Sequence, residues 1–400
     1  MYLMNGNKKV LWFDEDYTTI KVLDNDFLPY SMKDYVKNSD DVSFKQAVFN
    51  IGILKDFFLS RLLLMSLENA KAILNSANFP QSLKTSEKLQ IVEFCRGVTM
   101  SDNFWIQKDD ENLSFDIVNL RKASLSESDV IFDIAILGKT LTIQPELLTP
   151  VLTTKGMYPK TFTKEKDTIW FIKTDNLSEN SLTKAELQVS DILDTSNVNH
   201  IKYFPERKQV TYMDGKTKNL LLAKCKCYAN DKYSVVEASN IREWCDHTGK
   251  DFLTYVIQNF SKDFAKMCVV DYIVANTDRH WDNWGFMVDN ETNKIISMAP
   301  LFDHNNALIA DSFNTNIDDA IYDPTNTHML DAAVQYFPMA CLSIDENILP
   351  DKCQKRLQTI KEKYSPKDPF YSESNLKHIQ RGIEAINSGA GTEHELIDED

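Results

Sequence analysis

Three oxygen-bearing side chains in the second half of this 400-residue chain have the types and spacing that phosphoryl transfer requires. Asp278 lies five residues before Asn283, and Asp303 follows Asn283 by twenty residues across a predicted hairpin. Phosphoryl transfer needs a carboxylate that orients the attacking hydroxyl, and it needs oxygen ligands for Mg²⁺. Because Mg²⁺ is a hard cation, carboxylate and amide oxygens suit it. The three residues therefore predict one metal–phosphate site that uses ATP.

The other residues of this motif are expected to support the site. The catalytic loop of protein kinases has the same interval from aspartate to asparagine. We expect His280 to hold the loop by hydrogen bonds, although a histidine here can also be a metal ligand or a general base. Arg279 can anchor the loop or contact phosphate, and the sequence leaves both roles open. Trp281 and Trp284 are expected to pack.

A lysine and a glutamate upstream occur in the order of the ion pair that positions ATP phosphates in kinases. Lys173 ends a β-branched and aromatic strand predicted over 168–173. Glu186 follows thirteen residues later, in a helix with Ser181 or Thr183 as its candidate N-cap. The order of these residues before the aspartate–asparagine–aspartate set predicts that Lys173 contacts ATP and that Glu186 is its partner.

Two further segments are candidates for nucleotide contacts. The loop 153–160 precedes the lysine strand and holds one glycine, so its phosphate contacts would use backbone N–H groups and side chains. Its candidate residues are Thr153, Thr154, Gly156 and Lys160, and an ordinary connector is the alternative. Cys225, Lys226 and Cys227 follow a predicted buried strand, where the hinge that hydrogen-bonds adenine would lie.

The composition excludes several other classes of protein. The formal net charge of −15 disfavours direct binding to DNA or RNA, although it leaves room for a local basic patch. The eleven glycines form neither a dinucleotide motif nor a P-loop. The seven cysteines lack the spacing of a metal site and are expected to be reduced thiols. Without a signal peptide or a long apolar run, we expect a cytoplasmic protein that does not enter membranes.

The pattern of the chain changes after Pro150, which divides it into predicted parts. We expect an N-terminal accessory domain over 1–149 and an acidic, disordered tail over 388–400. Between them we expect a smaller region over 150–236 and a helical region with the catalytic loop over 237–387. The predicted elements are a hairpin at 9–24, an apolar helical pattern at 43–77, strands at 103–106 and 220–227, a helix at 251–274 and a hairpin at 284–298.

At these residues the chain resembles the HipA-like serine/threonine kinases of bacteria. The segment 269–285 is similar to the catalytic loop of that family, and 299–303 is similar to its metal-binding strand end. Gly156 with Pro159 and Lys160 is similar to the family's substitute phosphate loop, and 171–173 to its lysine strand. The segment 99–106 is faintly similar to N-terminal segments of some members. The resemblance covers about 150–385 and implies an α+β, two-lobed kinase-like fold with an additional N-terminal domain.

The resemblance also implies roles for single residues. Asp278 would be the catalytic base, Asn283 and Asp303 would bind Mg²⁺, and Lys173 would contact the phosphates of ATP. The phosphoryl acceptor would be a serine or threonine of a protein. Members of the family can inactivate themselves by phosphorylating this loop, which makes Thr153 and Thr154 candidates. Many members are toxins beside a small DNA-binding antitoxin, so such a partner is one option.

The sequence leaves two alternatives open. Phosphoinositide kinases also use an Asp-Arg-His-x-x-Asn loop followed by an aspartate, so a lipid or small-molecule kinase is the first. The acidic composition and the lack of a dense basic cluster after Asp303 disfavour it. A pseudokinase that acts as a binding module is the second, although all three base and metal positions are filled. His304 and Asn305 replace the Phe-Gly that follows the aspartate in eukaryotic kinases, so we expect no activation switch of that kind.

Overall fold

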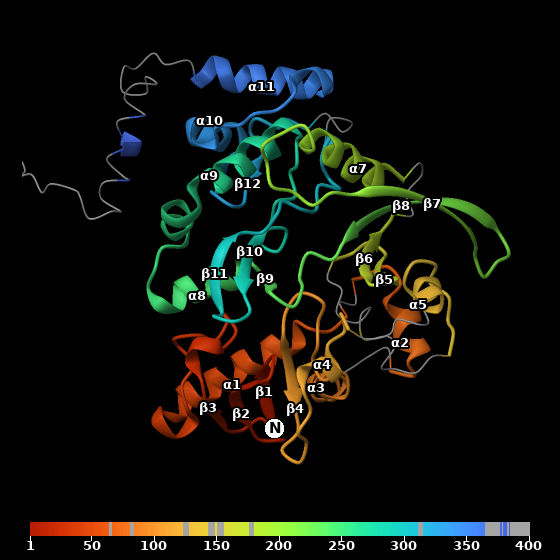
Figure 1. Ribbon diagram of the computed structural model, residues 1–400, viewed down its shortest axis with the longest axis vertical. Coiled ribbons are helices and arrows are strands. Elements are labelled where there is room, and N and C mark those ends of the chain that lie inside the picture. The colour runs from red at the N-terminus through yellow and green to blue at the C-terminus, as the bar shows by residue number, and fades with distance from the viewer. Residues whose placement is uncertain are drawn as a thin grey trace, which may run out of the picture.

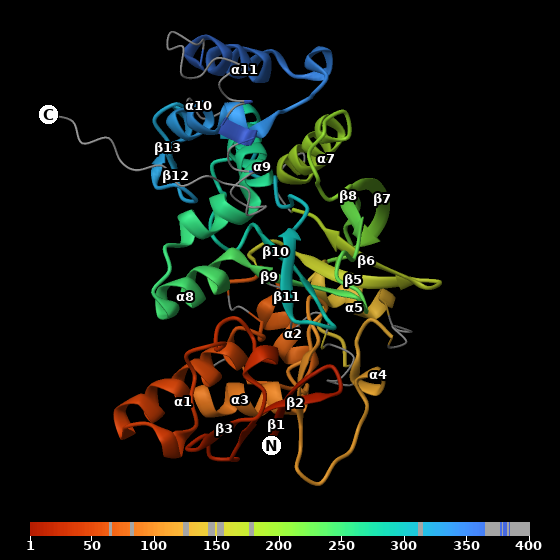
Figure 2. The same ribbon diagram turned by 60° about the vertical axis from the view of Figure 1, so that its left-hand side comes forward.

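The computed structural model describes most of the chain and places it in three parts. The described residues are 1–63, 66–80, 84–122, 128–142, 149, 156–175, 180–310, 315–364, 377, 379–381 and 384. The N-terminal domain and the helices α10 (Met329–Ala340) and α11 (Asp351–Tyr364) lie at opposite ends in both views (Figure 1 and Figure 2). The sheet of β9 (Tyr233–Glu237), β10 (Gly285–Asp289) and β11 (Lys294–Met298) lies between them. The predicted acidic tail and Thr153 and Thr154 lie outside the described residues. The α+β class is confirmed.

The N-terminal domain is built on a four-stranded antiparallel sheet with the order β3-β2-β1-β4. Its strands are β1 (Tyr2–Asn5), β2 (Lys8–Phe13), β3 (Ile20–Val22) and β4 (Phe104–Gln107). Its helices are α1 (Phe44–Leu59), α2 (Ala70–Ser76), α3 (Thr85–Phe94), α4 (Phe115–Val118) and α5 (Ser128–Ala135), with 3-10 turns at Asn25–Phe27 and Ser39–Asp41. Leu54 and Phe58 of α1 pack on Leu11 and Phe13 of the sheet.

The helical pattern over 43–77 is not one helix. Ser43 caps α1 by accepting a hydrogen bond from the backbone N–H of Gln46, but the helix ends at Leu59 and α2 begins only at Ala70. The break places Arg61 against Asp102, which is 41 residues further along the chain. A local apolar pattern contains no information on such a distant partner.

The second part is a four-stranded antiparallel sheet that packs against the helices α5 and α7 (Ser181–Leu193). Its strands are β5 (Lys160–Glu165), β6 (Thr168–Lys173), β7 (Phe204–Thr211) and β8 (Thr217–Lys226), in the order β5-β6-β8-β7. The register pairs Lys160 with Lys173 at one end of β5 and β6. The helix α7 (Ser181–Leu193) begins where predicted, but its N-cap position is Asn180. Asp175 instead accepts hydrogen bonds from both the N–H and the hydroxyl of Thr183, each at 2.7 Å, so the predicted caps are wrong.

The third part is mainly helical and carries the predicted catalytic loop. Its helices are α8 (Ala238–Thr248), α9 (Phe252–Ile273), α10 (Met329–Ala340) and α11 (Asp351–Tyr364), with a 3-10 turn at Glu346–Ile348. Its strands are β9 (Tyr233–Glu237), β10 (Gly285–Asp289), β11 (Lys294–Met298), β12 (Ile321–Tyr322) and β13 (Thr327–His328). The hairpin predicted here is confirmed, and the predicted long helix is present but kinked at Phe260, whose φ of −138° is not helical. Within the described ranges, no helix is long and apolar enough to cross a bilayer.

Candidate active site

A lysine and two carboxylates meet where the strand β6 faces the helix α7. The Nζ of Lys173 lies 2.5 Å from Oε2 of Glu186 and 2.9 Å from Oδ1 of Asp303. The same Oε2 accepts a hydrogen bond of 3.1 Å from the backbone N–H of His304. Glu186 and Lys173 are buried, so these contacts replace the water that both charges lose. Lys173 of the strand β6, Glu186 of the helix α7 and Asp303 therefore form one ion-pair network.

The network fixes the charge of its members. Burial opposes the charge on Lys173, but the carboxylates of Asp303 and Glu186 outweigh it and raise the pKa of Lys173. Burial likewise opposes the charge on Asp303, but Lys173 and Lys160 hold its pKa well below the usual range. Burial raises the pKa of Glu186, against the attraction of Lys173. A charged Lys173 beside a charged Asp303 is the arrangement that binds phosphate and a divalent cation together.

The catalytic loop starts where α9 ends. The helix stops at Ile273, and Ala275 has a φ of +55°, a left-handed conformation that turns the chain out of the helix. Asn283 donates from Nδ2 to the carbonyl oxygen of Asp278 at 2.8 Å, which closes the loop between the two predicted residues. Asn306 donates from Nδ2 to Oδ2 of Asp278 at 2.7 Å. The structure thus brings Asp278, Asn283 and Asp303 to one cleft.

Arg279 anchors this loop. Its side chain is fully buried, with Nε 2.8 Å from Oδ2 of Asp271 and Nη2 2.9 Å from Oδ1 of the same carboxylate. Its Nη1 donates to the carbonyl oxygens of Asn283 at 2.5 Å and Phe302 at 2.6 Å. The hydroxyl of Tyr322 also donates to Asp271, at 2.6 Å. Of the two roles left open by the sequence, the structure favours anchoring, because the donors of Arg279 are used inside the protein.

His280 lines the cleft beside the catalytic loop. Its Nδ1 accepts a hydrogen bond of 3.2 Å from the backbone N–H of Asp282, which supports the loop-holding role expected from the sequence. Trp284 is buried and packs against Phe252 and Phe264, as expected.

The residues present fit an Mg²⁺ ion. The bond from Nδ2 of Asn283 to a carbonyl leaves its amide oxygen available, and Lys173 engages one of the two carboxylate oxygens of Asp303. Asp303 has a φ of +58°, a conformation that aspartate tolerates better than most residues. Among the described residues, no group of three or more His, Cys, Asp or Glu side chains is placed to hold a metal. Mg²⁺ commonly takes phosphate oxygens as further ligands, so a pair of protein ligands such as Asn283 and Asp303 fits this ion.

Part of the predicted phosphate loop also lies at the cleft. Gly156 and Lys160 both line it, and the Nζ of Lys160 comes so close to Gly156 that a Cβ there would lie 2.3 Å away. Gly156 has a φ of +99°, which favours glycine. Burial lowers the pKa of Lys160 to about 8, against the attraction of Asp303. A second lysine therefore faces the same carboxylate as Lys173.

The predicted hinge lies one residue away from the residues that line the cleft. Cys225 lies in β8, Lys226 is its exposed last residue, and Cys227 follows it. None of the three lines the cleft. Burial raises the pKa of the Cys225 thiol to about 12, which favours the neutral thiol. The next residue, Tyr228, lines the cleft and stacks on Phe302 with their ring centroids 5.9 Å apart. Since Phe162 and Phe171 line the same cleft, aromatic rings are available to enclose a base.

Sequence reasoning missed several residues of the site. Asn306 had no signal beyond its nearness to Asp303. Asp271 had one, because it is a single carboxylate within the apolar run 267–275, eight residues before Arg279. The N-terminal domain also lines the cleft, whose volume is about 520 Å³, through residues such as Arg61 and Asp102. In the sequence, the faint resemblance of 99–106 was the only hint that the N-terminal domain contributes to the cleft.

Comparison with known proteins agrees with this geometry. The family model for phosphatidylinositol 3- and 4-kinases matches residues 162–322, which contain the ion-pair network and the catalytic loop. The serine/threonine-protein kinase CtkA of Helicobacter pylori is 27% identical over 150 residues. This chain carries a kinase-like domain. The match to CtkA covers 33% of this chain and 44% of that protein, so less than half of the relative's length is spanned.

Two solved structures are also similar to this chain. The crystal structure of CtkA, described as a proinflammatory kinase of Helicobacter pylori, is 16% identical and covers 56% of this chain and 94% of that one, with a TM-score of 0.32. A structure of HipA and HipB with operator DNA, a toxin–antitoxin system of Shewanella oneidensis, is 13% identical to this chain, with a TM-score of 0.47. The match covers 97% of this chain and 96% of that one.

Proposed function

We propose that this chain transfers the γ-phosphoryl group of ATP to a serine or threonine hydroxyl of a protein, with Mg²⁺ bound. The observation that carries the proposal is the ion-pair network of Lys173, Glu186 and Asp303 in the same cleft as Asp278 and Asn283. Kinases use this set of residues to hold phosphates and metal and to orient the acceptor. The match to a serine/threonine-protein kinase supports the choice of acceptor.

Each residue has a role that follows from its contacts. Because Asn306 holds one carboxylate oxygen of Asp278, the other oxygen can orient the acceptor hydroxyl and take its proton. Lys173 and Lys160 neutralise charge on the transferring phosphoryl group. When bound, Mg²⁺ would stabilise the charge that develops on the phosphate oxygens. The acceptor oxygen forms the new bond to the γ-phosphorus, while the bond to the bridging oxygen of ADP breaks.

The test follows radiolabel from [γ-³²P]ATP into a lysate protein pool and into phosphatidylinositol vesicles. We expect label on serine and threonine of proteins, and Lys173→Met should reduce it at least a hundredfold. Lys218→Met is the matched control, because Lys218 is exposed on the neighbouring strand β8. Thermal unfolding of both variants shows whether the fold is kept. If wild-type protein labels neither pool, the chain is not a kinase for these acceptors and the binding-module alternative gains.

A lipid kinase is the second candidate, because the matching family model describes phosphatidylinositol kinases. The same assay decides between the two. Label that enters the vesicles and not the proteins would replace the protein acceptor with a lipid.

Autophosphorylation and an antitoxin partner are further parts of the proposal that rest on the family resemblance. Intact-mass analysis after incubation with Mg·ATP should show one added phosphate that Thr153→Ala with Thr154→Ala removes. No added phosphate in the wild type would exclude autophosphorylation under these conditions. HipB and operator DNA accompany HipA in the similar structure, and a small antitoxin for this chain is proposed by analogy alone.

A further inference from the structure

The N-terminal domain forms one wall of the cleft that contains the catalytic residues. The wall consists of Ser31, Ser60, Arg61 and the segment 99–102, all of which line the same cleft as Asp278. These residues come from the loop before α1, from the turn that ends α1 and from the loop before β4. An acceptor that reaches Asp278 within this cleft therefore passes along side chains of the N-terminal domain.

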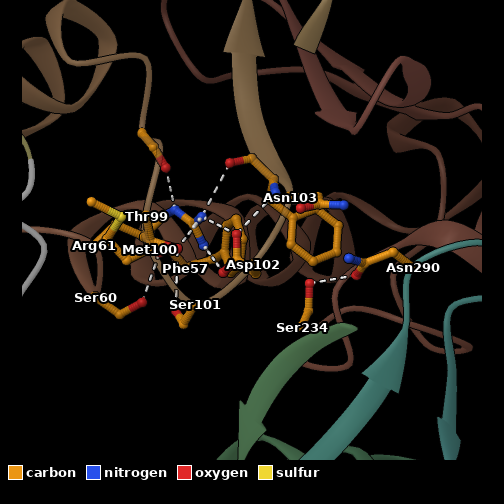
Figure 3. Close-up of polar contacts among 12 residues, drawn as sticks. Phe57, Ser60, Arg61, Thr99, Met100, Ser101, Asp102, Asn103, Ser234 and Asn290 are labelled. Carbon is orange, nitrogen blue, oxygen red and sulfur yellow. Dashed lines mark hydrogen bonds and ion pairs between the residues drawn. The ribbon is translucent and has the colours of Figure 1, made fainter. Parts of the chain in front are cut away.

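The wall is fixed within its own domain. Arg61 is buried and holds Asp102 through two bonds, Nη1 to Oδ2 at 3.0 Å and Nη2 to Oδ1 at 2.5 Å. Arg61 also donates to the carbonyl oxygens of Gly97 at 2.5 Å and Phe104 at 3.1 Å. Figure 3 shows the guanidinium directed at Asp102. A bidentate buried pair of this kind positions its loop with little freedom.

The wall is also joined to the kinase-like domain. The backbone N–H of Val235 donates to the carbonyl oxygen of Ser101 at 2.8 Å, which ties the segment 99–102 to β9. The side chain of Asn293 donates to the carbonyl oxygen of Leu28 at 2.9 Å, and the hydroxyl of Tyr30 donates to the carbonyl of Asn293 at 3.2 Å. The wall therefore faces the catalytic loop as part of one connected structure.

The charges of the wall decide which acceptor suits it. Among the described residues that line the cleft, the lysines and arginines are Lys160, Lys173 and Arg61. The two lysines face Asp303, and the charge of Arg61 is balanced by Asp102. A headgroup that carries phosphates would need further cations, which the wall does not provide. Instead the wall offers short hydroxyl side chains, and Ser234 and Asn290 add a hydroxyl and an amide from β9 and the β10–β11 turn (Figure 3).

One hydroxyl of the wall has no partner. Ser31 is buried, and its Oγ has no hydrogen bond to any described residue. A buried hydroxyl without a partner costs free energy, and a ligand group that bonds to it after a rotation of the Ser31 side chain would recover that cost. The backbone N–H and C=O groups of an extended peptide are such groups, and they need no charge on the wall.

We propose that this wall is the acceptor-binding surface of the enzyme and that it takes an uncharged, serine- or threonine-containing peptide segment in preference to an anionic lipid headgroup. This inference rests on the proposed function, since it names the acceptor class of the same site. It assigns the N-terminal domain a direct part in substrate recognition.

The test uses a degenerate peptide mixture with a fixed central serine or threonine. Ser60→Trp adds bulk to the wall at an exposed position, and Ser86→Trp makes the same change on α3, outside the cleft. We expect the KM for the peptide mixture to rise at least tenfold in Ser60→Trp, and to change less than twofold in Ser86→Trp. The KM for ATP should rise less than the KM for the peptide in both variants.

A second variant removes the unpaired hydroxyl. Ser31→Ala should raise the KM for the peptide about threefold to tenfold, the range of one hydrogen bond, while thermal stability is kept or rises. Equal peptide kinetics in Ser60→Trp and Ser86→Trp would overturn the proposal. Preferred labelling of phosphatidylinositol vesicles, lost in Ser60→Trp, would also overturn it, because the wall would then serve a lipid. If wild-type protein labels neither acceptor, the proposed function fails first, and the inference falls with it.

Discussion

The buried pair of Asp271 and Arg279 gives the sharpest prediction about how the catalytic loop is held. Asp271→Ala would leave the guanidinium of Arg279 buried, with Nε and Nη2 deprived of their two carboxylate partners. The hydroxyl of Tyr322 and the side-chain amide of Asn276 would lose the same acceptor. One substitution therefore removes four hydrogen bonds from a site that water does not reach.

The magnitude follows from these contacts. Removing one partner of a buried ion pair costs about 3–5 kcal/mol, and an orphaned buried hydroxyl costs about 1–3 kcal/mol. Since such losses are not additive, we expect the free energy of unfolding to fall by about 4 kcal/mol. That is about a thousandfold in the folding equilibrium, and a large part of the stability of an ordinary domain.

Urea unfolding followed by tryptophan fluorescence measures this loss, because Trp284 is buried in the same core. The double variant Asp271→Leu with Arg279→Met removes both charges of this pair, so it should lose less stability than Asp271→Ala alone. Both variants should lose phosphoryl transfer, since Arg279 also holds the carbonyl oxygens of Asn283 and Phe302. A loss below about 1 kcal/mol in Asp271→Ala, or a double variant that is the less stable of the two, would refute this reasoning.

Four further predictions concern the three residues Lys160, Asn306 and Gly285. Because Lys160 has a pKa of about 8, it loses its charge above that pH, so kcat/KM for ATP should fall above about pH 8 in the wild type but not in Lys160→Arg. Because of the same lowered pKa, the unfolded chain binds more protons than the folded chain above pH 8. The contribution of Lys160 to stability therefore rises between pH 8 and its ordinary pKa of 10.5. Urea unfolding of the wild type and of Lys160→Met across this pH range measures that rise. Asn306→Ala should lower kcat about tenfold to a hundredfold with the KM for ATP little changed, because a hydrogen bond to the charged Asp278 is lost; an unchanged kcat would contradict this role. Gly285→Ala should destabilise the protein by about 1–3 kcal/mol, since the new Cβ would lie 2.2 Å from a carbonyl oxygen of β9. Gly52→Ala in α1, where a Cβ has open space, is the control in a thermal unfolding assay.

The sequence predicted the parts of the fold that local patterns encode. The strand 168–173, the helix after Asn180, the long helix before Asp278 and the following hairpin are all present. Each has a strong periodicity and clear ends: Asp251, for example, caps α9 by accepting a hydrogen bond of 2.7 Å from the backbone N–H of Thr254. The helical pattern over 43–77 failed because its interruption depends on a partner 41 residues away.

The candidate site was predicted where chemistry restricts the choice of residue. The spacing of Asp278, Asn283 and Asp303 and the order of Lys173 and Glu186 were read from the sequence, and the structure brings all five residues together. Their roles in catalysis stay predictions. The loop residues Thr153 and Thr154 lie outside the described residues, and the domain boundaries also stay predictions.

The parts that sequence reasoning missed depend on contacts between distant segments. Asn306 acquires its role only when the chain after Asp303 folds back over the catalytic loop. The wall depends on the contact between Arg61 and Asp102, which forms only when two loops of the N-terminal domain meet. We expected that domain to be a scaffold or a partner-binding unit, since it contains no cluster of chemical groups. Its residues nevertheless line the cleft with Asp278.

The central claim is that Asp278 promotes phosphoryl transfer from ATP held by Lys173 and its partners. A single-turnover quench-flow measurement with Mg·[γ-³²P]ATP and the degenerate peptide mixture tests it most directly, comparing the wild type, Asp278→Asn and the neighbouring control Asp282→Asn. We expect all three proteins to bind ATP with dissociation constants within about threefold, and transfer to be at least a hundredfold slower in Asp278→Asn alone. Equal transfer rates in Asp278→Asn and the wild type would contradict it.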